Sequence, residues 1–213
     1  MKNVDDLIES AAELADRGLS KGEIADELNV SRETASWLVE RSGASPAADT
    51  DPSDGPSGPH DIHVDWSAIG RDSWRLSTMS AAMADLLEKE GESVDLTIGI
   101  EKAGAPIATS IARELDTDLA TYAPRKHQWD EGDLDDLGGS LSRNFAEIRG
   151  RECYVVDDII TSGTTLTETI EAVKKQGGKP VAACVLVDKQ GHDEIDGVPV
   201  YSLLQVLRVG NDE

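Results

Sequence analysis

Apolar residues recur at helical spacing near the start of the chain. One stripe along a helix face is formed by Val4, Leu7, Ile8, Ala11, Leu14 and Ala15. Gly18 is placed to end this helix as a C-cap. Ser20 and Glu23 then form a capping box for a second helix, and Ser31 can cap a third helix that runs to about Arg41. The pattern therefore predicts three short helices.

The second and third helices have the pattern of a helix-turn-helix. Their shared core is predicted at Ile24, Leu28, Val30, Ala35 and Leu38. Ala25 supplies a small residue where the two helices touch, and Asn29 lies where the turn requires a residue that tolerates positive φ. The pattern predicts a small all-α, DNA-binding domain over residues 1–42. The alternative is a three-helix module that serves only dimerisation or docking.

The third helix is the candidate DNA-reading element. Its outward face consists of Ser31, Arg32, Glu33, Ser36, Trp37 and Glu40. Arg32 can bind guanine or a phosphate, and the two serines can reach phosphates or bases. Trp37 is predicted to face outward because Ala35 and Leu38 already take the inward direction. Contact with DNA, cover for the linker and packing on a dimer partner stay open as its role.

Residues 43–61, GASPAADTDPSDGPSGPHD, have the composition of a linker. The run is rich in Pro, Gly, Ser and Asp and has no hydrophobic periodicity, so it cannot bury enough apolar surface to order itself. A second domain is predicted over residues 62–213. Its first residues, IHVDW at 62–66, could supply the strand of a wing after the third helix.

The second domain alternates strands and helices. A long amphipathic helix is predicted near residues 74–90, another helix opens near Pro106, and a third spans about 163–176. Strands are predicted at residues 94–100, 119–124, 152–158, 179–188 and 198–204. Apolar strands separated by helices indicate an α/β fold with a parallel sheet covered on both faces.

The strongest chemical signal is CYVVDDIITSGTT, residues 153–165. A buried strand delivers Asp157 and Asp158 to its C-terminal end, and a hydroxyl-rich loop leads into a helix. The loop residues that would surround a phosphate are Thr161, Ser162, Gly163, Thr164 and Thr165. The two carboxylates would accept hydrogen bonds from the hydroxyls of an adjoining ribose. The alternative is a pair of helix-capping acids, or a divalent-metal pair without a sugar.

This motif resembles the phosphoribosyl pyrophosphate (PRPP) signature of type I phosphoribosyltransferases. The resemblance covers about residues 66–210 and implies a Rossmann-like core of five strands, a small hood over the pocket, and a homodimer. A second match is GIEKAGAP, residues 99–106. In that family the equivalent loop holds pyrophosphate, a role that the resemblance gives here to Lys102, Ala103 and Gly104.

A third loop departs from the family pattern. The orotate branch reads Arg-Lys-x-x-Lys-x-His-Gly, and this chain matches it at Arg125, Lys126 and Gly132, which adds Arg125 and Lys126 to the pyrophosphate side. Trp129 stands at the second lysine and Glu131 at the histidine. In the enzymes this loop neutralises charge on the departing pyrophosphate, an effect commonly worth about 3–4 kcal/mol per donor. The departures argue against catalysis.

Charge is distributed evenly rather than gathered in a tail. The chain has 42 acidic and 20 basic residues and a formal net charge of −22, and the three segments 1–42, 43–61 and 62–213 carry −5, −4 and −13. Such a surface is typical of adaptation to molar salt, where the Debye length falls to about 3 Å and self-repulsion is screened. The alternative is an ordinary acidic protein.

Several function classes are excluded by what the chain lacks. No apolar run is long enough to span a membrane, and the N-terminus has no signal-peptide core, so a cytoplasmic protein is expected. Cys153 and Cys184 lie in apolar runs and are expected as buried free thiols. No metal site is expected, because His60 and His63 lie in or beside the linker without nearby cysteines, and His192 is expected to be exposed in a turn.

The whole combination resembles the haloarchaeal GfcR family of transcriptional regulators. That resemblance implies a regulator of sugar-catabolic genes that binds promoter DNA as a homodimer or higher homo-oligomer. It implies a PRPP or phosphosugar sensor that requires no cofactor, with Mg²⁺ only as the companion of PRPP. The alternative is an active orotate-type phosphoribosyltransferase with an accessory DNA-binding module.

The charge generates a prediction about salt. We expect the purified chain to lose its cooperative thermal unfolding in dilute buffer and to regain it in molar KCl, because the carboxylates repel one another when they are not screened. Circular dichroism at matched pH in the two buffers measures this. A chain that stayed folded and bound its operator best in dilute buffer would contradict the halophilic interpretation.

Overall fold

The chain forms two compact units. The structure is a computed structural model that describes residues 4–17, 19, 21–42, 62–124, 140–142 and 144–206. Contacts between Cα atoms divide the chain into a first unit, Met1–Trp66, and a second unit, Ser67–Glu213. The predicted linker over residues 43–61 lies outside the described residues.

The first unit contains the three predicted helices. They are α1 (Val4–Asp16), α2 (Lys21–Glu27) and α3 (Arg32–Ser42). The Oγ of Ser31 accepts a hydrogen bond from the backbone N–H of Thr34 at 3.1 Å, which confirms Ser31 as the cap of α3. Asn29 has φ of 53°, as predicted for the turn. The predicted caps at Gly18 and Ser20 lie outside the described residues.

A single apolar cluster holds these helices together. Its buried members are Leu7, Ala11, Leu14, Ile24, Ala25, Leu28, Val30, Ala35 and Leu38. All five residues predicted for the helix-turn-helix core belong to it. The helices are too short to be stable alone, so their order depends on this shared burial.

Residues 62–66 lie in the first unit and not in the second. They form no strand, so the predicted wing strand is wrong. The Nδ1 atom of His63 lies 3.2 Å from the backbone oxygen of Leu28, at the turn between α2 and α3. The segment therefore lies against the helix-turn-helix as an irregular stretch, and the described part of the first unit contains no strand with which it could pair.

The second unit is built on a seven-stranded sheet in the order β3-β2-β1-β4-β5-β7-β6. The strands are β1 (Leu96–Ile100), β2 (Asp118–Ala123), β3 (Ser140–Leu141), β4 (Glu152–Ile160), β5 (Lys179–Asp188), β6 (Glu194–Ile195) and β7 (Val198–Gln205). The five predicted strands pair in parallel, and the two short edge strands β3 and β6 pair antiparallel. The predicted α/β class with a largely parallel sheet is confirmed.

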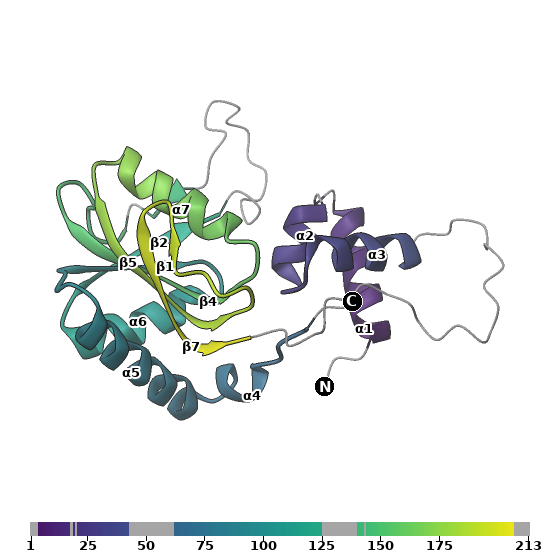
Figure 1. The fold of residues 1–213 in the computed structure, drawn as a ribbon, viewed down its shortest axis with the longest axis horizontal. Coiled ribbons are helices and arrows are strands. Elements are labelled where there is room, and N and C mark those ends of the chain that lie inside the picture. The colour runs from purple at the N-terminus through teal and green to yellow at the C-terminus, as the bar shows by residue number, and fades with distance from the viewer. Residues whose placement is uncertain are drawn as a thin grey trace, which may run out of the picture. The chain divides into compact units, whose positions relative to one another are not determined.

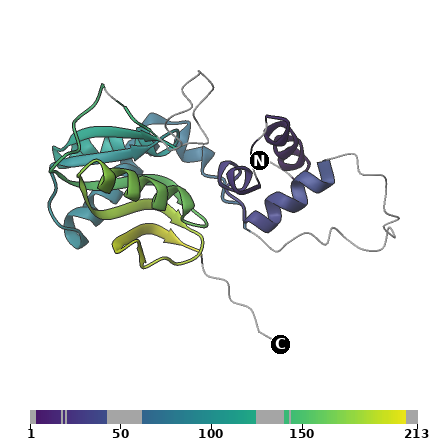
Figure 2. The same cartoon turned by 90° about the horizontal axis from the view of Figure 1, so that it is seen from above.

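Helices cover both faces of this sheet (Figures 1 and 2). The helices are α4 (Ser67–Gly70), α5 (Ser73–Glu90), α6 (Gly104–Leu115) and α7 (Thr164–Lys175). Figure 1 shows α7 on one face and α5 with α6 on the other. Strand β1 is buried at every residue, which fits its largely apolar sequence, and its one polar side chain, Thr97, is buried with the rest. No helix among the described residues is long and apolar enough to cross a membrane.

Candidate functional site

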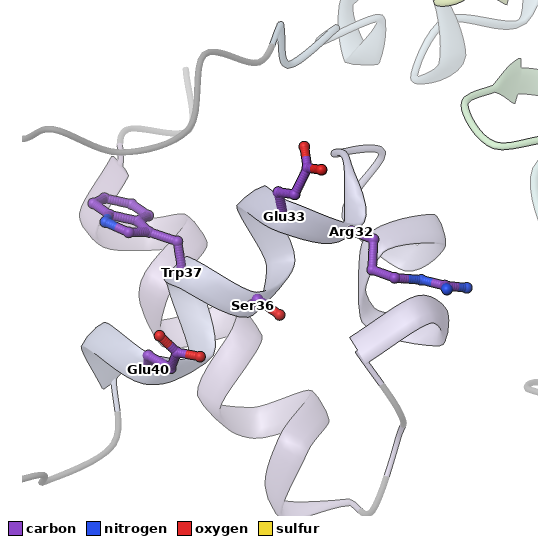
Figure 3. Close-up of a pocket in the computed structure, with 5 residues that line it drawn as sticks. All are labelled: Arg32, Glu33, Ser36, Trp37 and Glu40. Atoms are coloured by element: carbon purple, nitrogen blue, oxygen red, sulfur yellow. The ribbon is translucent and has the colours of Figure 1, made fainter.

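The outer face of α3 carries an open hollow (Figure 3). It is lined by Arg32, Glu33, Ser36, Trp37 and Glu40. Figure 3 shows Trp37 and Arg32 at its two ends with Ser36 between them. The structure therefore brings four of the predicted DNA-binding residues and Glu40 onto one surface. Ser31, the fifth predicted residue, uses its hydroxyl to cap α3.

Charges in this hollow are partly compensated. The Nζ of Lys21 on α2 lies 3.1 Å from Oε1 of Glu40, in an exposed ion pair. The Arg32 guanidinium lies against the start of α2, since a Cβ atom added to Gly22 would be 3.0 Å from Arg32 Nη2. One basic side chain thus faces the hollow from its edge, and one of the two acids has a cationic partner.

Trp37 is half-buried rather than fully outward. Its indole packs against the apolar cluster of the first unit. The guanidinium of Arg41 lies 5.3 Å from the ring centroid, within the range of a cation–π contact. The ring thus belongs both to the edge of the core and to the lining of the hollow.

The second candidate site lies where β4 passes into α7. Strand β4 continues to Ile160, two residues beyond its predicted end, so Asp157 and Asp158 lie within the strand and are half-buried. The backbone N–H of Asp158 donates to Oδ1 of Asp157 at 2.9 Å. Both acids therefore lie near the C-terminal end of β4, ahead of the loop into α7, and this hydrogen bond links them.

The loop after β4 gathers polar groups at the start of α7. Gly163 has φ of 77° and is the N-cap of α7, and the Oγ of Ser162 lies 3.4 Å from the backbone N of Thr164, the first residue of the helix. The hydroxyls of Ser162 and Thr164 lie 2.9 Å apart, and Thr161 is buried. Backbone N–H groups and hydroxyls thus gather at the positive end of a 12-residue helix.

The loop after β1 lies against the acids. A Cβ atom added to Gly104 would be 2.5 Å from the backbone oxygen of Val156 and 2.9 Å from the Cα of Asp157. Only glycine permits this approach, which brings the predicted pyrophosphate loop and the predicted ribose acids together. Lys102 is exposed and Ala103 half-buried in that loop, and the peptide bond between Glu101 and Lys102 is cis. Arg125 and Lys126 lie outside the described residues.

The end of β5 was not predicted as part of the site. Asp188, 1% exposed, accepts hydrogen bonds from the backbone N–H groups of Gln190 at 2.9 Å and Gly191 at 3.0 Å. Its Oδ1 lies 2.9 Å from Nδ1 of His192. His192 has an 18% exposed side chain, so the predicted exposed turn is wrong for this residue. The sequence signal for this arrangement is an Asp at the end of a strand that is followed by Gly and His within one turn.

Asp188 is a charged group held in place by donors. Burial acts to raise the pKa of Asp188, but hydrogen bonds from the Gln190 N–H, the His192 side chain and neighbouring backbone groups outweigh it, and the pKa lies below its ordinary value. The cysteines show the opposite effect: burial raises the pKa of Cys153 and of Cys184 to about 12. Both are free thiols, as predicted, and neither is a nucleophile at neutral pH.

Known proteins resemble this chain both over its whole length and over its second unit. A family model described as the phosphoribosyl transferase domain matches residues 65–206. A transcriptional regulator GfcR of Halorubrum lacusprofundi is 70% identical over 213 residues and covers 100% of both chains. Another from Haloarcula marismortui is 70% identical over 212 residues, 100% of this chain and 99% of the relative. The orotate phosphoribosyltransferase structure from Aeropyrum pernix has a TM-score of 0.56 and 22% identity, over 70% of this chain and 82% of that chain, and supports the fold alone.

The hydrogen bonds that the Asp188 carboxylate accepts predict that the stability of the second unit falls in acid. We expect Asp188→Asn to lower the free energy of unfolding of the second unit by roughly 2 kcal/mol at neutral pH, because the amide loses an acceptor oxygen. Since the pKa of Asp188 is lowered in the folded chain, its contribution is complete above the ordinary value of 3.8 and is lost as the pH falls through the lowered pKa. Denaturant unfolding in molar KCl at several pH values measures this.

Asp193→Asn is the matched control, because Asp193 is exposed in the same turn. The interpretation of Asp188 would be wrong if the two variants lost the same stability, or if the Asp188→Asn deficit did not shrink in acid.

Proposed function

This chain belongs to the GfcR family of transcriptional regulators and carries a phosphoribosyl transferase domain, and we propose that it binds promoter DNA in response to a phosphorylated ribose or sugar. The observation that carries the proposal is that one chain unites two short helices joined by a tight turn with a loop of glycine and hydroxyl residues at the start of α7. In this role the protein acts in the cytoplasm. The relatives match it over its whole length, so the proposal covers both units.

The first unit reads DNA through α3. The hollow lined by Arg32, Ser36 and Trp37 presents a guanidinium, a hydroxyl and an indole on one helix face, as a recognition helix in the major groove requires. A homodimer would place two such helices on half-sites about 34 Å apart. Two-fold avidity then adds to the affinity of each module.

The second unit senses the ligand. The loop over residues 161–165 binds the phosphate of PRPP or of a phosphosugar, and Asp157 and Asp158 accept hydrogen bonds from the ribose hydroxyls. Lys102, Ala103 and Gly104, with Arg125 and Lys126, form the pyrophosphate side. A bound PRPP brings Mg²⁺, for which the two carboxylates offer the oxygen ligands that this ion prefers. The ligand changes DNA affinity only if it binds the two DNA-binding states unequally.

The second candidate function is an active orotate-type phosphoribosyltransferase. The intact sequence of the phosphate loop and the fold favour it. The sequence of the third loop opposes it, because Trp129 and Glu131 replace the lysine and the histidine that would stabilise departing pyrophosphate.

One experiment separates these functions. Genome-wide crosslinking of the protein to DNA is combined with a purified assay of PRPP plus orotate or another base in molar KCl. We expect enrichment at promoters, a change in DNA affinity when PRPP is added, and no pyrophosphate release. Pyrophosphate release without promoter enrichment would establish the enzyme instead. The absence of both would leave only a docking module on an inactive domain.

Arg32 tests the DNA face directly. We expect Arg32→Ala to weaken binding to a crosslinked promoter fragment about tenfold, because a bidentate contact to guanine or a phosphate contact is lost. Fluorescence anisotropy in molar KCl measures the affinity. Arg113→Ala is the matched control, since it removes the same charge from an exposed position of α6 in the second unit. Equal affinity of the two variants would contradict the assignment of α3.

A further inference from the structure

The turn between β5 and β6 packs against the phosphate loop. A Cβ atom added to Gly163 would lie 2.8 Å from Cδ1 of Ile195 and 3.7 Å from Nε2 of His192. Ile195 is buried in the apolar cluster beneath α7. The imidazole of His192 is therefore held beside Gly163, at the loop that begins α7.

The ring of His192 has a fixed orientation. Its Nδ1 atom lies 2.9 Å from Oδ1 of Asp188, a carboxylate that also accepts from the backbone N–H groups of Gln190 and Gly191. Because a carboxylate only accepts, Nδ1 is the nitrogen that donates. Nε2 is then the remaining polar atom of the ring, and among the described residues no hydrogen-bond partner of Nε2 is found.

We propose that His192 is a ligand-binding residue that contacts the phosphate ester of the effector through Nε2. This inference rests on the proposed sensing function and adds the β5–β6 turn to the pocket as a further segment. With protons on both nitrogens, the imidazolium lies between the Asp188 carboxylate and the ligand phosphate. It donates Nδ1–H to the first and Nε2–H to the second, and the contact to the phosphate is a charge-assisted hydrogen bond.

Two substitutions at this position separate the two ring nitrogens. His192→Asn places an amide N–H near Nδ1, where it can still donate to Asp188, but leaves nothing at Nε2. His192→Gln extends the amide to the position of Nε2 and restores a neutral donor there. A purely structural role of His192 depends on Nδ1 and therefore predicts that asparagine is the better substitute. The proposed role predicts the reverse.

The experiment is isothermal titration calorimetry of the full chain in molar KCl, with PRPP and with ribose 5-phosphate as probes. We expect His192→Asn to weaken the affinity for ribose 5-phosphate about tenfold, the effect of losing a charge-assisted hydrogen bond. His192→Gln should recover part of that loss. His63→Gln, a histidine change in the first unit, should bind as the original chain does. Thermal unfolding of each variant reports whether the turn is intact.

The outcomes distinguish this proposal from the function on which it rests. If the original chain binds both probes and His192→Asn binds them equally well, the assignment of His192 is overturned and the sensing function stands. If the original chain binds neither probe, the sensing function fails and His192 fails with it. If His192→Asn has the higher affinity of the two variants, or if both variants lose thermal stability together with affinity, the role of His192 is structural.

Discussion

The parallel pairing of β1 with β4 is the constraint on which the candidate pocket depends. The pairing sets Leu96 opposite Cys153 and Gly99 opposite Val156, so the two strands end at the same edge of the sheet. The loop after β1 then meets the acids of β4, and Gly104 allows its backbone to approach Val156 and Asp157. Neither motif makes a pocket alone. The sheet order joins two segments that lie far apart in the sequence.

Long buried elements were predictable because many residues in each of them repeat the same hydrophobic pattern. Strand β5 is predicted by its continuous apolar run, and α7 by an amphipathic stretch that begins after Gly163 and ends before Gly177. The two-residue strands β3 and β6 could not be found this way. They exist only because β2 and β7 offer them an edge to pair with, and two residues carry no periodicity of their own.

The site was predictable to the same degree. Asp157, Asp158 and the phosphate loop are contiguous in sequence, so one motif contains them. His192 was placed wrongly because its ring is held by the buried carboxylate of Asp188 and lies beside Gly163, which belongs to a separate segment. Trp37 shows the corresponding limit on a helix. Periodicity gives the direction of its side chain but not the neighbours that half-bury it.

Binding and turnover place their demands on different parts of this fold. In the proposed sensor, the loop that begins α7 and the acids of β4 hold the phosphate ester and bind the ground state. Catalysis requires additional groups that stabilise the charge on departing pyrophosphate, and these act only in the transition state. A chain can therefore lose the second set while it keeps the first. Trp129 and Glu131 stand where the orotate-type pattern has lysine and histidine, which agrees with the proposal of a sensor that keeps affinity for a substrate it does not consume.

The acidic surface changes how α3 would select DNA. In molar salt the release of counterions contributes little to affinity, and long-range repulsion between the chain and DNA is screened to about 3 Å. Hydrogen bonds and ion pairs at contact distance are not screened in this way. Glu40 already has a cationic partner in Lys21. The carboxylate of Glu33 also lines the hollow, and because it can only accept hydrogen bonds, it needs a donor on the DNA. In the major groove the amino groups of cytosine and adenine are such donors, and the acceptors of guanine and thymine are not. If the chain works in concentrated salt, as its charge predicts, a carboxylate on this face adds little general affinity and excludes poorly matched sites.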